Sequence, residues 1–295
     1  MLKACNYRIH VRSTAGIESA YYIDEIDIML DCGVCFDLAY TKSNVFITHG
    51  HVDHIQGIVA HAARRALMSL PTANYHVPHW LVSEVQNILS SYSKMQEKTI
   101  QANLIPVKEK DEFKISHDHI VKAYKTFHRV PSLGYVVYKR NKALKQEFVN
   151  LSFLEIAGIS KQGIELNVIS IDPEIAYTGD TTMQLFHAEG CSYDGTKNDF
   201  LRAKVLITEA TYIDKAALIE KAEDRGHIHL EQVINDAYLF ENVQQLIITH
   251  TSARYNEHDF NACRERLPHS LKFKLQFVYP YRSKKTYPAY RRRPY

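Results

Sequence analysis

The ten residues from Thr48 to Gly57 read T-H-G-H-V-D-H-I-Q-G and follow directly on the apolar run from Val45 to Ile47. Such a run predicts a β-strand that ends at a turn. Imidazole nitrogens and carboxylate oxygens are ligands of zinc and similar metals, so three histidines and one aspartate within six positions offer four donors on one loop. One or two histidines on a polar loop would more often lie in water, but this spacing favours a metal site.

Further donors stand after three later strand-like runs. His128 follows the run 120–124, Asp180 follows 175–177, and His250 follows 246–248. Open α/β folds place their sites at strand ends, so we expect all seven donors to converge. Seven donors are too many for one tetrahedral zinc, but they suit two ions that share a carboxylate and a water.

Five other motifs accompany the metal loop in a fixed order: H-x-x-x-S-x-G-Y (128–135), Y-T-G-D-T-T (177–182), T-E-A-T (208–211), G-H (226–227) and H-x-S-x-R-Y (250–255). Together with H-x-H-x-D-H they resemble the metallo-β-lactamase superfamily. Within it the chain resembles the short, plant-type form of tRNase Z, the endonuclease that removes 3′ trailers from precursor tRNA. Any one motif alone would be weak, but the set is highly specific.

The resemblance implies an α/β fold, the metallo-β-lactamase αβ/βα sandwich of two mixed β-sheets with helices on the outer faces. The site would lie across the edge where the two sheets meet. One domain is expected over residues 1–280, and residues 281–295 form a C-terminal tail rich in basic residues, tyrosine and proline.

The resemblance also implies roles for the donors. His49, His51 and His128 would form the first metal site, Asp53, His54 and His250 the second, and Asp180 the bridge. Two Zn²⁺ per chain are expected, although Mn²⁺ or Fe²⁺ would suit the same donors. A metal-bridging hydroxide would then cleave the phosphodiester and leave 3′-OH and 5′-phosphate ends.

A general acid must protonate the departing ribose oxygen. His227 resembles the histidine that does so in tRNase Z, Glu209 resembles the carboxylate that orients it, and Asp53 would touch both this relay and the metal. His229 could be the acid instead, but we expect it to pack or to cap the following helix. The residues expected to bind substrate are Ser132, Tyr135, Thr181, Ser252, Arg254 and Tyr255.

Two segments differ from the family pattern. The stretch T-A-G-I-E-S-A (14–20) stands where family members often carry a P-x-K-x-R-N loop that faces the tRNA 3′ end. Between Tyr135 and Tyr177, long members insert a protruding arm that grips the tRNA elbow. With only about forty residues there we expect no full arm. We predict a helix that carries Lys139, Arg140, Lys142, Lys145 and Lys161, either as a solvated face or as a substitute phosphate-binding surface.

The composition predicts a cytoplasmic protein with a proper core. Apolar residues make up 45% of the 295 positions, yet no run approaches the length of a membrane span, and the N-terminus lacks a hydrophobic signal core. The five cysteines form no recognisable disulfide framework, so Cys32 and Cys35 are predicted to be free thiols.

The basic residues are unevenly distributed. Eight of the 36, and none of the 33 acidic residues, lie between Lys272 and Tyr295, so the rest of the chain is mildly acidic. Tyrosines and prolines interleave these charges. That pattern suits backbone and stacking contacts with RNA, but it equally suits a solvated disordered tail.

Three functions follow from these observations. The first is a precursor-tRNA endonuclease that forms a homodimer, with no organic cofactor and no membrane partner. The second is a hydrolase of small esters or phosphodiesters, and the third is a non-catalytic RNA-binding relative. Glu209, His227 and H-x-S-x-R-Y favour the first, because simple thioester or lactam hydrolases of the superfamily do not need them.

Overall fold

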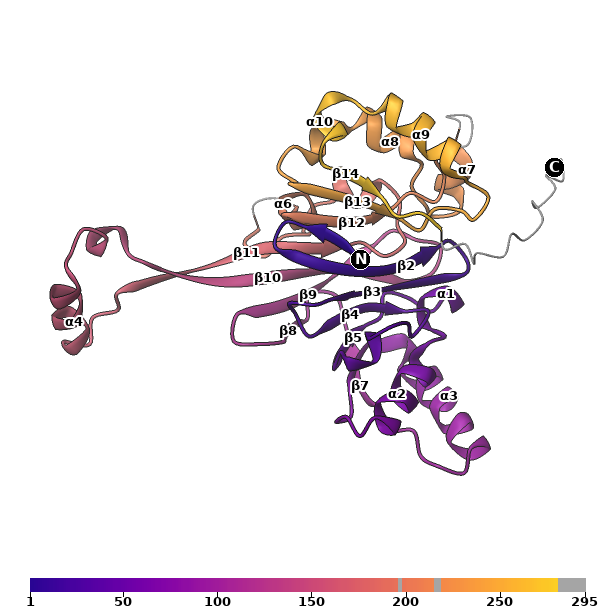
Figure 1. Ribbon diagram of the computed structural model, residues 1–295, viewed down its shortest axis with the longest axis horizontal. Helices are drawn as coiled ribbons and strands as arrows, with labels where there is room; N and C mark the ends of the chain where they lie inside the picture. Colours follow the sequence, from indigo (N-terminus) through magenta and orange to yellow (C-terminus); the bar gives the residue numbers. More distant parts are fainter. Residues whose placement is uncertain (196–197, 215–218, 281–295) are drawn as a thin grey trace.

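A computed structural model describes residues 1–195, 198–214 and 219–280. Two seven-stranded sheets lie face to face, and helices cover the outer face of each (Figure 1). The fold class predicted from the sequence is therefore confirmed. The predicted tail, residues 281–295, lies outside the described residues.

The first sheet has the strand order β1-β2-β3-β4-β5-β6-β7. Its strands are β1 (Leu2–Ala4), β2 (Tyr7–Thr14), β3 (Glu18–Ile23), β4 (Ile28–Cys32), β5 (Asn44–Phe46), β6 (Asn74–Pro78) and β7 (Asn103–Val107). Pairing is antiparallel from β1 to β4 and parallel from β4 to β7. β5 enters the sheet between two parallel neighbours and delivers the metal loop at its end.

The second sheet has the order β14-β13-β12-β11-β10-β9-β8. Its strands are β8 (Glu112–Lys114), β9 (His119–Thr126), β10 (Ser132–Leu144), β11 (Asn167–Tyr177), β12 (Val205–Glu209), β13 (Gln245–Thr249) and β14 (Leu275–Phe277). Pairing is antiparallel from β8 to β11 and parallel from β11 to β14. Strands β9, β11, β12 and β13 therefore run in one direction, and their carboxyl ends meet at one edge.

Most helices lie outside the sheets. The α-helices are α1 (Val52–Ile55), α2 (Ile58–Leu67), α3 (Val82–Met95), α4 (Phe153–Lys161), α5 (Gln184–His187), α6 (Asp199–Arg202), α7 (Ile219–Asp224), α8 (Leu230–Asn235), α9 (Glu257–Arg266) and α10 (His269–Lys272). Short 3-10 helices are η1 (Ala39–Thr41), η2 (His79–Leu81), η3 (Gln146–Phe148) and η5 (Ala237–Phe240). None of the helices within the described ranges is long and apolar enough to cross a membrane.

Three apolar clusters form the core. The central one fills the space between the sheets and includes Tyr21, Phe46 and Tyr135. The other two pack the outer face of each sheet against its helices. β5, β12 and β13 consist of apolar or β-branched residues with few polar exceptions, which suits strands with parallel neighbours and cover on both faces. All five cysteines are free, as predicted.

The segment between Tyr135 and Tyr177 corrects two predictions. β10 and β11 stay paired as far as Leu144 and Asn167, and the resulting two-stranded arm projects from the body with α4 at its tip (Figure 1). The expectation of no full arm was therefore wrong. The predicted helix was also wrong for the basic residues 139–145, because they lie in β10 or next to it; only Lys161 is helical.

The physical reason lies in backbone hydrogen bonding. We expected part of this segment to return to the sheet, which would leave too few residues for an arm. Instead the two strands satisfy each other's N–H and C=O groups beyond the sheet. Such a ribbon needs no further neighbours, so nearly the whole segment is available to project.

Candidate active site

The common edge of the two sheets brings the predicted donors together. The metal loop follows β5, His128 follows β9, Asp180 follows β11, Glu209 ends β12, and His250 follows β13. His250 has φ 54°, a left-handed conformation that non-glycine residues seldom adopt, so the loop turns sharply there. Only folding brings these positions together: Asp53 and His250 lie 197 residues apart in sequence and make a contact of 3.2 Å.

The first group of donors consists of His49, His51, His128 and Asp180. Nδ1 of His51 lies 3.0 Å from Nε2 of His49 and 3.3 Å from Nε2 of His128. Oδ2 of Asp180 lies 3.8 Å from Nε2 of His49 and 3.9 Å from Nε2 of His128. Burial lowers the pKa of all three histidines, which favours the neutral form that can bind a metal.

The second group consists of Asp53, His54 and His250. Nε2 of His250 lies 3.2 Å from Oδ2 of Asp53 and 3.3 Å from Nε2 of His54. Asp180 faces this group with Oδ1, which lies 3.3 Å from His54 Nε2. Asp180 thus presents one oxygen to each group. The loop that departs from the family pattern also reaches this site, because the backbone N–H of Gly16 donates to Asp53.

Four histidines are held by a partner on the Nδ1 side. Nδ1 of His54 donates to Asp31 and Nδ1 of His128 donates to the carbonyl of Gly226, both over 2.7 Å. Thr48 and Thr211 donate their own hydroxyl protons to carboxylates, so they accept from Nδ1 of His49 and His250. In each ring Nε2 then carries the lone pair and faces the donor groups, which is how metal-binding histidines are oriented.

These contacts test whether the residues fit a metal. Oδ1 of Asp180 is buried and makes no hydrogen bond with any described residue, although Nε2 of His54 lies 3.3 Å from it. Burial lowers the pKa of His54, but the charges of Asp180 and Asp31 more than offset this effect and raise it well above its usual range. Both observations indicate that a cation between Asp180 and His54 would be stabilised. Oxygen and imidazole donors without a thiolate suit zinc, manganese or iron.

Asp31 is a functional residue that sequence reasoning missed. It lies in β4, is fully buried, and accepts from Thr48, from the Tyr177 hydroxyl at 2.6 Å and from His54. Its φ of 53° turns the end of the strand towards the metal loop. The available signal was an aspartate inside an apolar strand, since a buried carboxylate requires several donors.

Asp31→Asn is expected to weaken metal binding by about 10- to 100-fold, the usual cost of losing an outer partner of a metal ligand. The amide keeps the shape but removes the charge that holds His54 in its tautomer. Competition with a fluorescent chelator would measure the change. Tyr177→Phe removes one donor to the same carboxylate but keeps its charge, so it should cost less. Equal affinities for wild-type protein and Asp31→Asn would contradict this role.

His227 forms a third group with Asp180, Glu209 and His250, whose ligand atoms lie close enough together to hold an ion, and within this group it is held by Glu209. Its Nδ1 donates to Oε1 of Glu209 over 2.7 Å. Thr181 N–H donates to the same oxygen, and the Thr211 hydroxyl donates to Oε2. Burial lowers the pKa of His227, but the charge and hydrogen bond of Glu209 outweigh it and raise the pKa to about 9. At neutral pH the ring therefore holds a proton that it could donate.

The glycine before His227 is required by close packing. Gly226 has φ +74°, and a Cβ there would lie 2.7 Å from the backbone nitrogen of Arg129 and 2.8 Å from Nδ1 of His128. The alternative acid, His229, is buried at the start of α8, where Nδ1 accepts from the N–H of Glu231. It therefore caps the helix, as expected.

Asp53 differs from the expected relay. Its contacts within the described chain are with Gly16, His54 and His250, and none is recorded with Glu209 or His227. Besides Glu209, the carboxylate that lies near His227 is Asp180, with Oδ2 at 3.9 Å from Nδ1. The predicted contact between Asp53 and the relay is therefore wrong for the described residues, because His250 lies against both Asp53 and His227. The role of Asp53 as a metal ligand stays a prediction.

Three of the residues predicted to contact substrate are buried and hold other groups of the site. Tyr135 and Thr181 are fully buried: the first donates to the carbonyl of Ile47, and the second holds Glu209. Tyr255 is also buried and accepts from the N–H of Ile213. Tyr135 and Tyr255 thus satisfy backbone groups that burial would otherwise leave unpaired, and Thr181 fixes the carboxylate beside His227.

The remaining predicted substrate residues differ in exposure. Ser132 is buried but lines a cleft beside the site, where its hydroxyl bonds that of Thr126 over 2.6 Å. Ser252 is half-buried, and its N–H donates to the carbonyl of Thr211. The Arg254 guanidinium covers the ring of Tyr255 at 4.7 Å.

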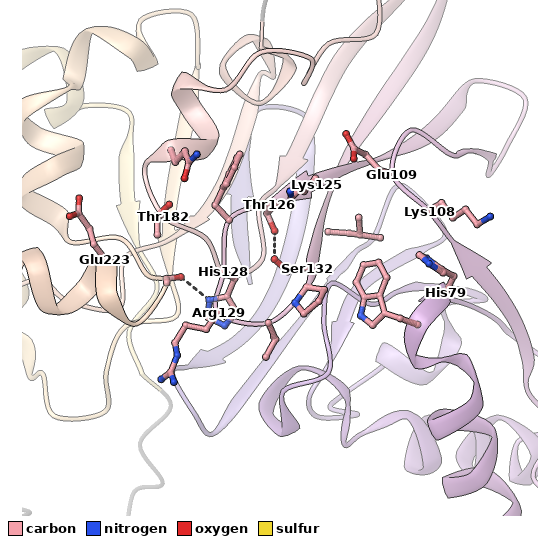
Figure 2. Close-up of a pocket in the computed structure, with 17 residues that line it drawn as sticks. His79, Lys108, Glu109, Lys125, Thr126, His128, Arg129, Ser132, Thr182 and Glu223 are labelled. Carbon is pink, nitrogen blue, oxygen red and sulfur yellow. Dashed lines mark hydrogen bonds between the residues drawn. The ribbon is translucent and has the colours of Figure 1, made fainter.

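Two adjoining clefts open at the site. The smaller, of about 410 Å³, is lined by His51, His227 and two arginines that the sequence did not single out, Arg129 and Arg225. The larger, of about 920 Å³, runs past His128 between the two halves of the chain (Figure 2). Arginines beside a metal centre indicate an anionic substrate.

No protein-family model matches the sequence. Among curated proteins, tRNase Z TRZ1 of Arabidopsis thaliana is 35% identical over 265 residues, which cover 90% of this chain and 92% of the relative. The chloroplastic tRNase Z TRZ2 of the same plant is 34% identical, with 85% and 69% covered.

Solved structures share the fold at low identity. The short form of human tRNase Z, ELAC1, superimposes with a TM-score of 0.55 at 18% identity and covers 92% of this chain and 96% of its own. The metallo-β-lactamase fold protein YhfI of Bacillus subtilis gives 0.56 at 13% identity, with 92% and 95% covered.

Proposed function

Because this chain belongs to the tRNase Z family, we propose that the two donor groups at its strand ends hold two metal ions at the centre that cleaves RNA. The protein is a metal-dependent endoribonuclease that processes the 3′ ends of tRNA. One observation carries the two-ion proposal: Asp180 turns one oxygen towards each group of histidines.

His49, His51 and His128 would hold one ion, and Asp53, His54 and His250 the other, with Asp180 shared between them. Zn²⁺ is the ion we propose, since imidazole and carboxylate ligands suit it, and Mn²⁺ or Fe²⁺ would fit the same donors. When bound, such ions would lower the pKa of an attacking water and neutralise a phosphate oxygen.

His227 would supply the proton to the departing ribose oxygen. Glu209 holds Nδ1, which leaves Nε2 to face the smaller cleft that the ring lines. The raised pKa keeps the ring protonated at neutral pH, and Thr181 and Thr211 fix the carboxylate that maintains it. A positioned acid contributes roughly a hundred- to ten-thousand-fold in rate.

The arm offers a surface for the body of the tRNA. Lys139 is the last residue of β10 that pairs with β9, and Arg140 and Lys142 follow it on the part of β10 that pairs with β11 alone. This part of the strand projects from the body as the arm (Figure 1). We assign these side chains to phosphate contacts, in place of the helical surface predicted from the sequence. A homodimer would add a second RNA-binding surface, and light scattering that gave a monomer mass at micromolar concentration would contradict it.

Cleavage of precursor tRNA distinguishes the proposed endoribonuclease from a general esterase. Purified protein is expected to cut a 3′-extended precursor tRNA at a single position and to leave 3′-OH and 5′-phosphate ends, which end-labelled fragments on a sequencing gel would show. Bis(p-nitrophenyl) phosphate serves as the comparison. Hydrolysis of this small ester without cleavage of the precursor would favour a small-ester hydrolase, and RNA binding without either reaction would favour a non-catalytic relative.

A further inference from the structure

The larger cleft is not needed to hold the metal ligands. It begins at His128 and Gly226, passes Arg129, and extends to His79 and Lys108, which come from the first half of the chain. Figure 2 shows His128, Arg129, His79 and Lys108 along this one cleft. The smaller cleft shares His128, Arg129 and Val130 with it. A chain molecule bound across the site can therefore continue from one cleft into the other.

The larger cleft has a fixed aromatic surface. Trp80 is half-buried because it packs against the cluster between the sheets, and it lines the cleft. His79 meets the Trp80 ring edge-on at a centroid distance of 4.9 Å, and its own Nδ1 donates to the carbonyl of Val107. Phe127, also half-buried, forms a second ring in the lining. Held rings of this kind are stacking platforms for bases.

Charged side chains surround these rings. Lys108, Lys125 and Arg129 line the cleft and are exposed, while Glu109 and Glu223 also belong to the lining. Nζ of Lys125 lies 5.8 Å from the centre of the Phe127 ring. Cations next to aromatic rings suit a single-stranded nucleic acid, whose phosphates alternate with bases that stack regardless of sequence.

The position of His227, the proposed general acid, indicates which part of the RNA would lie in the larger cleft. His227 lines the smaller cleft and is absent from the described lining of the larger one. The atom that His227 protonates is the 3′ oxygen of the tRNA body, so the body would lie on the side of the smaller cleft. The other fragment keeps the phosphate and is the 3′ trailer.

We propose that the larger cleft is a trailer subsite, in which a base of the first trailer nucleotides stacks on Trp80 while Lys108 and Lys125 face their phosphates. This inference rests on the proposed function. It assigns a role in substrate selection to the single tryptophan of the chain.

Precursors with trailers of one to eight nucleotides would test the subsite. For wild-type enzyme, kcat/KM should rise with trailer length until a base reaches Trp80 and then level off. Trp80→Ala should flatten this rise, mainly through KM, and lower kcat/KM for long trailers by roughly 5- to 150-fold, the loss expected for one base–aromatic stack. Tyr238→Ala removes an aromatic ring that is 61% exposed and outside the cleft, so it should keep the wild-type length dependence.

Fluorescence of the unmodified protein gives an independent measurement. Because Trp80 is the only tryptophan, a 5′-phosphorylated oligouridylate should quench its emission saturably. Unchanged emission, or a length dependence that Trp80→Ala leaves intact, would overturn the subsite while precursor cleavage continued. Failure of wild-type enzyme to cut any precursor would instead remove the proposed function.

Discussion

His227→Ala is expected to keep its metal and to bind precursor tRNA, but to lose turnover by at least about a hundredfold, the low end of the contribution of a general acid. The loss should appear in kcat, because the ring acts on the leaving oxygen in the transition state and is no metal ligand in our assignment. Single-turnover cleavage of a labelled precursor would measure it, with metal content determined on the same sample.

His229→Ala is the matched control. His229 lies two residues further on, is buried, and caps α8 through Nδ1. Its loss should cost stability, typically about 1 kcal/mol for a helix cap, and leave kcat within a few-fold. A hundredfold loss in His229→Ala together with normal turnover in His227→Ala would reverse the assignment of the acid.

The pH dependence of kcat should follow from the contact between His227 and Glu209. His227 must be protonated to act, so its contribution to kcat is present below its pKa and is lost as pH rises through that pKa. Glu209 raises that pKa to about 9, and nearby metal cations would lower it, so the alkaline limb should fall at or below pH 9. Glu209→Gln removes the raising charge, so the limb should move to lower pH. An alkaline limb at the same pH in Glu209→Gln and in wild-type protein would contradict the effect of Glu209 on the pKa of His227.

Asp180→Ala is expected to abolish turnover, with a loss of at least about a thousandfold, because a metal centre supplies several kcal/mol of transition-state stabilisation and each 1.4 kcal/mol is tenfold. Asp180 presents one oxygen to each donor group, so its removal should weaken both ions. Elemental analysis of wild-type protein should find about two ions per chain, and fewer in the variant.

Asp118→Asn provides the control, because Asp118 is an exposed aspartate whose contact is with His117, outside the donor groups. It should keep both ions and full turnover. Chelation of wild-type protein should likewise abolish cleavage, and added zinc should restore it. A wild-type protein with one ion, or an Asp180→Ala variant with unchanged metal content, would contradict a shared carboxylate.

The candidate donors and the fold class could be predicted from the sequence alone. His49, His51, Asp53 and His54 lie on one loop, so their proximity follows from chain connectivity alone. The later donors each follow an apolar run that forms a strand, and strands with one direction in a sheet end at one edge. Both patterns involve residues that are close in sequence, so they can be recognised without a structure.

The groups that support the donors, and the residues that are accessible, become visible only in the folded chain. Asp31 orients His54 from 23 residues away, and Gly226 holds His128 from 98 residues away. Tyr135 and Thr181 belong to motifs yet are buried, and Trp80 belongs to no motif yet lines the cleft. Hydrogen bonding and burial depend on contacts between distant segments, and so does the pairing of β10 with β11 that makes the arm. Local sequence patterns do not predict contacts between such distant segments.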